Sequence, residues 1–564
     1  MEAFPISDED VVPTLEEDPA LGLSHREKME ILFAVMLGLF LGALDQTIVG
    51  PALPTIATQL NGNEYYVWVI TAYLLTSTIS VPFWGKLSDL YGRKPIFMIG
   101  IVIFLIGSAL SGLSQNMGML ILFRGIQGIG AGSLFPVALA VIGDLFTPQE
   151  RGKYQGLFGA VFGVAFVVGP LVGGFLTENI SWHWIFYVNI PIGIVSLVVI
   201  QRLLPTVKTA KATKNFDILG GAIFTVAISF LLLGLTNKQF GKWEDLTVGG
   251  FILTGLVGIL LFIGAEARAK EPIIPLHLFR IRTYSSSMVS TFFASFAFFG
   301  AIIFLPRWFQ FVHGFSPTNS GLAALPLVIG LIFSSIVSGI IVSRTGKYKW
   351  MLVGAIVLMG VATAFMTQLT AETPLPVVWA WMFLAGLGVG PTFAVFTIVV
   401  QNAVPFHELG VATSNLTFFR QIGGSVALAI VGTIFGTSFT EQIGPQLTKA
   451  GVPDQVVAGF GQASASGQLD FNKLTGVGDL GAAILAGLPA QLQAAVQPFI
   501  TNIVTGIHEA FSLAVAQTFW LGVGAAIISA IAASMMHEHT LRTSYAPVTA
   551  PASAPEVAAA TATE

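Results

Sequence analysis

Long apolar runs separated by short polar segments dominate the chain from residue 29 to residue 535. Each run holds about twenty residues, the length that a helix needs to cross a hydrocarbon core of about 30 Å. Because lipid offers no hydrogen-bond partner to a backbone amide, such segments span a membrane as helices. We therefore predict an all-α membrane protein with fourteen transmembrane helices. The predicted spans are 29–51, 65–85, 95–114, 118–141, 153–177, 184–204, 216–235, 246–265, 284–311, 319–342, 350–369, 376–402, 409–435 and 510–534.

Composition supports lipid as the solvent for most of the chain. Of the 564 residues, 54% are hydrophobic and 10% are charged, whereas soluble globular chains carry about 25% charged residues. The net charge of −4 gives no sign of nucleic-acid binding. The chain has no cysteine, which excludes disulfides and thiol catalysis.

The distribution of basic residues predicts the orientation in the membrane. An even number of spans puts both termini on one side, and most Lys and Arg lie in the loops of that side. The basic residues on the opposite side are Lys238, Lys242, Lys449 and Lys473. By the positive-inside rule, we predict a multi-pass protein of the cell (inner or plasma) membrane with both termini cytoplasmic.

An internal repeat predicts the domain organisation. The segment 85–94 returns in weaker form at 339–347, each time after the second span of a six-span block. Two such blocks around two extra spans follow the parallel-repeat plan of many secondary transporters. The predicted units are a cytoplasmic N-terminal tail at 1–28, a six-helix bundle at 29–204, two inserted transmembrane helices with flanking loops at 205–283, a second six-helix bundle at 284–534 that includes a long outer loop at 436–508, and a disordered cytoplasmic tail at 535–564.

Two ionisable residues fall inside spans at matching depth. Asp45 lies about six residues before the outer end of the first span, and Arg124 about six residues after the start of the fourth, so both lie roughly 10 Å below the outer surface. They can therefore meet, and a group so costly to bury is by default functional. The alternative is an ion pair that only holds two helices together. Asp45 is the one carboxylate well inside a span of the first half, so we predict that it carries the proton if protons drive transport.

A short basic loop joins the second and third predicted spans. It contains Gly85, Asp89, Gly92, Arg93 and Lys94, so a single acid lies among cations and can face the positive end of a neighbouring helix. An ordinary positive-inside loop is the alternative. The spacing Gly-x-x-x-Asp-x-x-Gly-Arg-Lys resembles the signature loop of the major facilitator superfamily. In that family the acid and the arginine latch the cytoplasmic side closed, and the resemblance implies the same gating role here.

Further segments narrow the resemblance to one branch of that superfamily. The segments are 44–54, 120–130, 165–174, 182–193 and 420–424. Together they resemble the fourteen-span drug:proton antiporters of the EmrB/QacA type, although Gly50-Pro51, Ala165 and His183 depart from the family pattern. The resemblance implies the major facilitator fold, with two six-helix bundles plus two inserted helices.

Gly169, Pro170, Gly173 and Gly174 lie in the segment that resembles the antiporter motif of that family. Small residues and a proline along one helix face permit close packing and a bend. Simple helix packing would use the same contacts, and the resemblance favours antiport.

Several residues are candidates for a substrate cavity. Arg420 lies near the middle of the thirteenth span without an obvious acidic partner, so it could contact backbone carbonyls, Asn415 or a substrate. Phe292, Phe296 and Phe299 share one face of the ninth span, where they could line an adaptable apolar cavity or serve packing and lipid contact. The remaining candidate cavity residues are Gln46, Gln127 and Asn189.

Motifs of other function classes are absent from the sequence. It has no Gly-Lys-Ser or Gly-Lys-Thr of a phosphate loop, no His-Glu-x-x-His and no Gly-x-Ser-x-Gly. Gly128, Gly130 and Gly132 imitate a dinucleotide fingerprint, but they lie inside an apolar span with no strand before them, which favours helix packing. We therefore expect neither an ATP-driven pump nor an enzyme, and no cofactor or metal.

The combined observations predict a proton-coupled antiporter that exports hydrophobic or cationic drug-like compounds by alternating access. Its expected partners are a small-molecule substrate, protons and the lipid bilayer, and we expect a monomer that binds no nucleic acid. The alternatives are export of an endogenous lipid or metabolite, and an uptake symporter or facilitator of the same fold.

Overall fold

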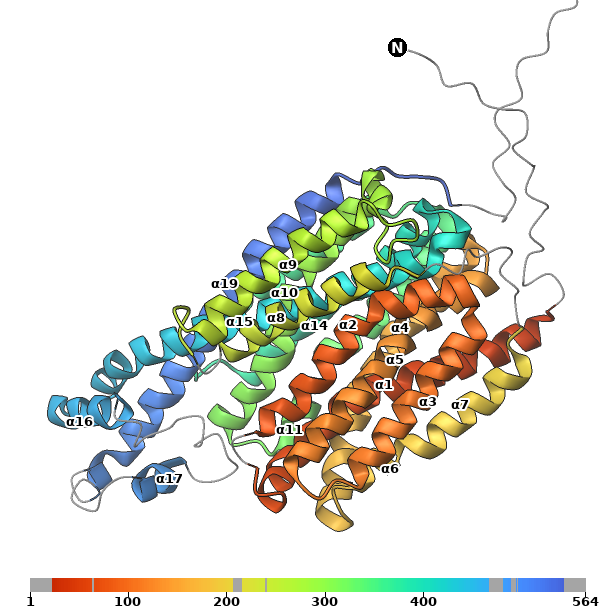
Figure 1. The fold of residues 1–564 in the computed structure, drawn as a ribbon. Helices are drawn as coiled ribbons and strands as arrows, with labels where there is room; N and C mark the ends of the chain where they lie inside the picture. The colour runs from red at the N-terminus through yellow and green to blue at the C-terminus, as the bar shows by residue number, and fades with distance from the viewer. Residues whose placement is uncertain are drawn as a thin grey trace, which may run out of the picture.

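A computed structural model describes residues 23–62, 65–205, 216–238, 241–465, 480–487, 493 and 496–541. Within these ranges the chain is helical apart from turns and short connections, and Figure 1 shows the helices as one elongated bundle. The predicted all-α fold is confirmed. Most of the predicted N-terminal tail, residues 206–215, parts of the predicted outer loop and the C-terminal tail from residue 542 lie outside the described residues.

The helices of the first half begin at residues that suit a helix terminus. Ser24 forms a capping box with Glu27, Thr147 forms a second one with Glu150, and the side chain of Asn116 caps a third helix. Each cap satisfies backbone amides that the first helical turn leaves without a partner. The helices are α1 (His25–Gln59), α2 (Tyr66–Tyr91), α3 (Arg93–Gly112), α4 (Met117–Leu145), α5 (Pro148–Asn179), α6 (Trp184–Tyr187) and α7 (Asn189–Leu203).

Two helices then separate the first half from the second. They are α8 (Ile218–Asn237) and α9 (Phe251–Glu266), the latter preceded by the π-helical turn η1 (Leu246–Gly250). A short 3-10 helix, η2 (Leu276–Arg280), leads into the second half. The helices of that half are α10 (Arg282–His313), α11 (Pro317–Ala323), α12 (Leu325–Thr345), α13 (Lys349–Met366), α14 (Leu375–Ala403), η3 (Phe406–Glu408), α15 (Leu409–Lys449), α16 (Asp454–Ala465), α17 (Leu480–Gly487), η4 (Gln497–Phe499) and α19 (Ile500–Ser534).

The helices agree with the predicted spans in order and position. Thirteen helical segments of the described chain are long and apolar enough to cross a membrane. The remaining predicted span, 65–85, corresponds to α2, which has 26 residues and packs against α4. The count of fourteen is therefore consistent with the structure.

Helices α15 and α19 extend beyond the spans predicted from hydropathy. α15 has 41 residues and continues to Lys449, whereas the predicted span ends at residue 435. At 1.5 Å per residue this helix is about 60 Å long, roughly twice the thickness of a hydrocarbon core. Its final turns and α16 therefore project from the bundle, at the end opposite to the one where α1 begins (Figure 1). The predicted outer loop at 436–508 thus begins and ends with continuations of spans.

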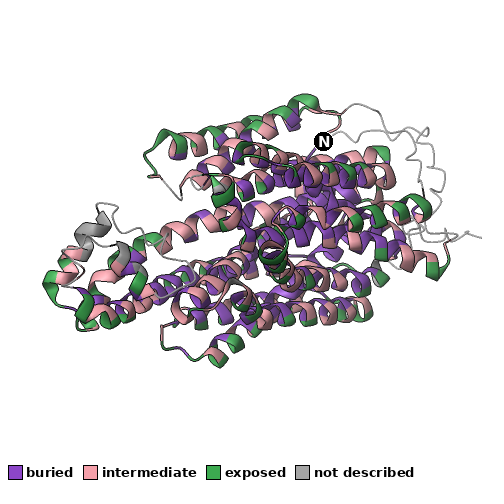
Figure 2. Cartoon of the chain, turned by 90° about the horizontal axis from the view of Figure 1, so that it is seen from below, coloured by how far each residue is buried: buried purple, intermediate pink, exposed green. Residues whose placement is uncertain are grey.

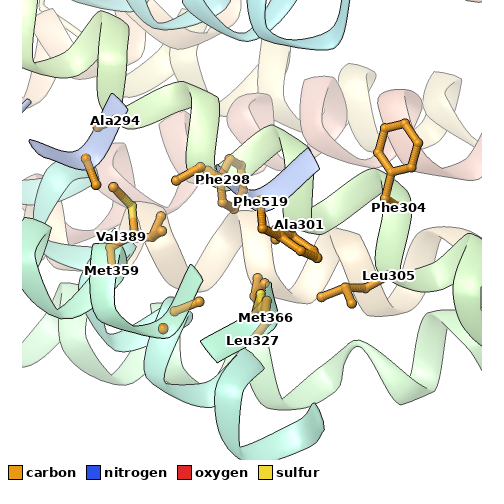
Figure 3. Packing of buried hydrophobic residues seen from close by; sticks show 14 of the residues in the cluster. Ala294, Phe298, Ala301, Phe304, Leu305, Leu327, Met359, Met366, Val389 and Phe519 are labelled. Carbon is orange, nitrogen blue, oxygen red and sulfur yellow. The ribbon is translucent and has the colours of Figure 1, made fainter. Parts of the chain in front are cut away.

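Each half of the bundle has its own apolar core. Helices α1 to α7 share one cluster of buried side chains, and α10 to α19 share another; Figure 3 shows Phe298, Met366 and Phe519 packed in the second. Figure 2 shows that buried residues concentrate inside the bundle and exposed ones on its outside. A surface rich in exposed apolar side chains is what a lipid environment requires.

The inserted helices α8 and α9 pack against one side of the bundle. Phe224 of α8 contacts Phe418 of α15, and Val81 of α2 belongs to the same cluster. On α9, Leu253 and Leu260 are 63% and 70% exposed. The pair therefore bridges α2 and α15, which belong to different halves, and presents its outer face to lipid.

The cysteine-free chain allows a direct test of orientation. Ala458 on α16 and Lys347 after α12 are exposed, and they lie beyond opposite ends of the spans. With cytoplasmic termini, we expect a membrane-impermeant maleimide added to intact cells to modify Ala458→Cys but not Lys347→Cys. Labelling after lysis, which exposes both positions, is the control. The reverse pattern would overturn the orientation, and labelling of both in intact cells would overturn the span count.

Candidate functional site

Asp45 and Arg124 meet inside the first half, as their predicted depths allow. The Nη1 of Arg124 donates to Oδ2 of Asp45 at 2.6 Å. The other carboxylate oxygen accepts from Nε2 of Gln127 at 2.7 Å and from Nδ2 of Asn189 at 3.1 Å. Asp45 is 0% and Arg124 1% exposed. Because both oxygens accept hydrogen bonds from N–H groups, the arrangement suits an ionised carboxylate that is sealed from solvent.

A second set of contacts fixes the guanidinium. Arg124 lies over the ring of Tyr73, 4.1 Å from its centroid, and its Nε donates to the carbonyl of Val69 at 3.4 Å. On the other side, Asn189 donates to Oγ of Ser108, which in turn donates to the carbonyl of Phe186. The pair is therefore held by residues of α1, α2, α3, α4 and α7.

Glycines let these helices approach closely enough for the pair to form. A side chain on Gly107 would collide with the backbone of Gln127, and one on Gly128 would collide with Tyr73. Gly130 and Gly132 pack in the same way against α3 and α2. Close helix packing therefore explains the glycine spacing of α4.

The predicted cavity residues divide between the site and its surroundings. Gln127 and Asn189 hydrogen-bond to Asp45 inside the first half, whereas Gln46 is exposed. Tyr73 and Ser108, which contact Arg124 and Asn189, were not predicted. Their signal in the sequence is weak, because a tyrosine and a serine are common in any span.

The predicted gating loop joins the two halves. Asp89 accepts hydrogen bonds from the backbone amides of Gly410 at 3.0 Å and Val411 at 2.7 Å, in the first turn of α15. The carboxylate thus lies at the positive end of a helix of the other half. Arg93 is ion-paired with Asp89 and donates to Oδ2 of Asp144 at 2.9 Å.

The remaining loop residues have separate roles. A side chain on Gly85 would collide with Ser414, so this glycine allows α2 to approach α15. Gly92 adopts a φ of 91° between α2 and α3, a conformation that other residues rarely adopt. Lys94 donates to the carbonyl of Gln201 at 2.7 Å and therefore stays within the first half.

A buried amide pair also links the halves at this end of the bundle. Nε2 of Gln155 donates to Oε1 of Gln401 at 2.8 Å. Nε2 of Gln401 donates to the carbonyl of Leu139 and to Oγ1 of Thr413, each at 3.1 Å. The two glutamines are 0% and 2% exposed. Together with Asp89, they close the end of the bundle where α1 begins.

The bridging contacts of Asp89 and Gln401 lie at the end of the bundle where α1 begins, so the two halves are joined there.

The glycines of α5 pack against the helix that carries Asp45. Side chains on Gly169 and Gly173 would collide with Thr47 and Ile48 of α1, and Oγ1 of Thr47 donates to the carbonyl of Ala165 at 2.9 Å. α5 continues as a helix through Pro170. Pro170 and Gly174 lie instead toward the second half, near Gly321 and Thr318.

A row of aromatic rings crosses from one half to the other. The ring centroids of Phe135 and Phe162 are 4.7 Å apart, those of Phe162 and Phe393 5.8 Å, and those of Phe393 and Phe298 5.6 Å. Arg420 lies over Phe393, 4.3 Å from its centroid, and donates to the carbonyl of Thr392 at 3.1 Å.

The three phenylalanines predicted for the cavity lie mostly in helix packing. Phe292 packs against Gly423 and Phe299 against Gly424 of α15. Phe296 is 5% exposed and lies in a cluster with Ala427 and Ala525 of α15 and α19. The neighbouring Phe298, which was not predicted, contacts the aromatic row instead. Among the residues that the structure describes, no group of three or more His, Asp or Glu could hold a metal ion.

Comparison with known proteins gives consistent matches. The sequence model described as Major Facilitator Superfamily matches residues 35–428. The chain is 37% identical over 490 residues to the Multidrug transporter protein MdtP of Bacillus subtilis (strain 168), covering 85% of this chain and 89% of that protein. It is 35% identical over 416 residues to Multidrug resistance protein 3 of the same organism, covering 73% of this chain and 80% of that protein.

Solved structures share the fold at much lower identity. The proton:xylose symporter XylE, bound to 6-bromo-6-deoxy-D-glucose, superposes with a TM-score of 0.56 at 12% identity, covering 90% of this chain and 95% of that one. At this identity the likeness concerns the arrangement of helices and not the substrate.

Proposed function

We propose that this chain, which belongs to the major facilitator superfamily, is a proton-coupled antiporter that exports hydrophobic or cationic drug-like compounds by alternating access. Membership of that family makes it a membrane transporter of small molecules and not an enzyme. The observation that carries the proposal is the buried carboxylate of Asp45, held by Arg124, Gln127 and Asn189. A titratable group enclosed within one half of a transporter is by default functional. The relatives named as multidrug transporters support the substrate class.

The packing of α1 offers a physical route from the proton to the substrate pathway. Asp45 lies less than one turn from Thr47 and Ile48, which contact Gly169 and Gly173 of α5. α5 in turn packs along α12 of the second half, where Gly152 lies against Gly339. Protonation of Asp45 releases Arg124, loosens α1 and so changes how α5 and α12 pack. The two halves then rock about their interface, as alternating access requires.

In this proposal the protein acts as a monomer in the cell membrane, with both termini in the cytoplasm. In that orientation the end of the bundle that Asp89 and Gln401 close is cytoplasmic. The latch of Asp89 and the pair of Gln155 and Gln401 then form the cytoplasmic gate.

Transport into proteoliposomes tests the proposal directly. In vesicles with an acidic interior, the protein molecules whose cytoplasmic face points outward exchange internal protons for external dye. We expect them to accumulate ethidium inside the vesicles, because protons leaving the vesicle drive the dye inward. A protonophore should release the accumulated dye, and protein-free liposomes serve as the control. Equal uptake with and without the pH difference would indicate facilitated diffusion, and dye movement in the same direction as protons would indicate symport.

A further inference from the structure

Two arginines lie inside spans near the centre of the protein, and they differ in their partners. Arg124 has a carboxylate partner, Asp45, and is buried. Arg420 is partly exposed, and its hydrogen-bond acceptor among the described residues is the carbonyl of Thr392. No described carboxylate forms an ion pair with Arg420. A guanidinium has five N–H donors, so Arg420 retains donors for a further acceptor.

The depth of Arg420 keeps its charge from reaching the membrane surface. It lies eleven residues after the start of α15, which places it about 16 Å along the helix, near the middle of a hydrocarbon core of about 30 Å. A side chain at that depth cannot place its head group among the lipid head groups. The charge must instead be stabilised by something inside the protein.

The surroundings of Arg420 place it between the two halves. Its guanidinium covers Phe393, and Phe393 contacts Phe162 of the first half. Phe298 contacts the same ring from α10. These phenylalanines offer an apolar surface beside a cation, which suits a ligand with an apolar body and one anionic group.

The charges of the described spans also favour an anionic ligand. When Asp45 is ionised, it neutralises Arg124, and Arg420 leaves one positive charge in the central region. When Asp45 is protonated, Arg124 adds a second. An organic anion would therefore be attracted in both states, and more strongly after protonation.

We propose that Arg420 is the anion-binding residue of the substrate cavity, and that the transported compounds include amphipathic organic anions such as carboxylates. The anionic group accepts hydrogen bonds from the free N–H groups of Arg420, and the apolar body lies on Phe393, Phe298 and Phe162. The inference rests on the proposed transport function and adds a substrate class to it. A purely structural Arg420, which only ties α15 to the carbonyl of Thr392, would give no preference for an anion.

Binding of a matched pair of probes separates these roles. The probes are 11-(dansylamino)undecanoic acid and its methyl ester, which share one apolar body and differ in charge. We expect the full-length protein in phosphatidylcholine nanodiscs to bind the acid roughly tenfold to hundredfold more tightly than the ester, the range for a charge-assisted hydrogen bond. Arg420→Gln should abolish the preference while leaving ester binding within about twofold, and Arg420→Lys should keep part of it.

Control variants test whether the preference for the acid depends on Arg420 itself. Arg307→Gln removes a different arginine, which lies on α10 six residues before the end of that helix, and should leave the preference intact. Equal binding of acid and ester by the parent, or an unchanged preference in Arg420→Gln, would overturn the inference, and so would failure to bind either probe. Uphill ethidium transport is measured separately. That measurement can support the proposed antiport when the anion subsite is refuted, and can refute it when the subsite is supported.

Discussion

Asp89→Asn is expected to open the end of the bundle that the structure shows closed. The parent carboxylate accepts from two backbone amides of α15 and pairs with Arg93. An asparagine retains one acceptor oxygen and no charge, so it loses at least one charge-assisted hydrogen bond, worth about 1.5–3 kcal/mol. A loss of this size shifts the balance between closed and open states by roughly tenfold to hundredfold. Transport rate should change more than substrate affinity, because Asp89 and Arg93 are not among the proposed substrate contacts.

Distance measurements between spin labels can detect this shift. Arg202 in the last turn of α7 and Lys347 after α12 are exposed at the closed end, on different halves. Labels at Arg202→Cys and Lys347→Cys should gain a population at longer distance when Asp89→Asn is added. Arg93→Ala should act in the same direction, since it removes the ion pair that orients Asp89.

Asp144→Asn provides the matched control for the latch. Asp144 also accepts a hydrogen bond from Arg93, but this contact stays within the first half. We expect this variant to leave the label distances close to those of the parent. If both carboxylates shifted the distances equally, the contact with α15 would not be the latch. If neither did, the segment 85–94 would be an ordinary positive-inside loop.

Geometry fixed along a helix axis could be predicted well from the sequence. The rise of 1.5 Å per residue gave matching depths to Asp45 and Arg124, and the structure brings them to 2.6 Å. Asp89 was expected at the positive end of a helix, and it lies at the first turn of α15. Both predictions needed only spacing, hydropathy and the direction of each span.

Geometry that depends on how helices rotate against one another could not be predicted in this way. Phe292 and Phe296 share a helix face, but spacing alone does not say which neighbour that face meets. The structure directs that face toward α15 and α19, and Phe298 contacts the aromatic row. The pair of Gln155 and Gln401 was missed for the same reason, since its members lie 246 residues apart.

The ends of α15 and α19 show a different limit. Hydropathy marks where a helix leaves lipid, whereas a helix ends where its backbone hydrogen bonds stop. Residues 436–449 are more polar than the span before them, yet they continue α15 without a break. Residues 436–449 and 500–508 of the predicted outer loop are therefore helical continuations of α15 and α19.

Asp45→Asn is expected to abolish proton-driven export while leaving a protein that still binds hydrophobic ligands. The substitution removes the titratable carboxyl group and keeps its shape, so Gln127 and Asn189 retain a neighbour of similar size. Arg124 loses the only carboxylate that the structure places beside it within the described chain. An unpaired buried charge costs about 3–5 kcal/mol, so lower thermal stability is also expected. The double variant Asp45→Asn/Arg124→Gln removes the unpaired charge and should recover part of that stability without recovering transport.

Ethidium efflux and binding together test the role of Asp45. In proteoliposomes with an acidic interior, the single and double variants should accumulate no more dye than protein-free vesicles, whereas the parent concentrates it. Ethidium should still bind to Asp45→Asn, because the substitution keeps the shape of the side chain and leaves the apolar surroundings in place. Glu266→Gln, which alters a buried acid at the end of α9, is the matched control and should keep proton-driven uptake. Uphill transport by Asp45→Asn at the parental rate would show that another group carries the proton, because asparagine cannot release one at any pH that the protein survives.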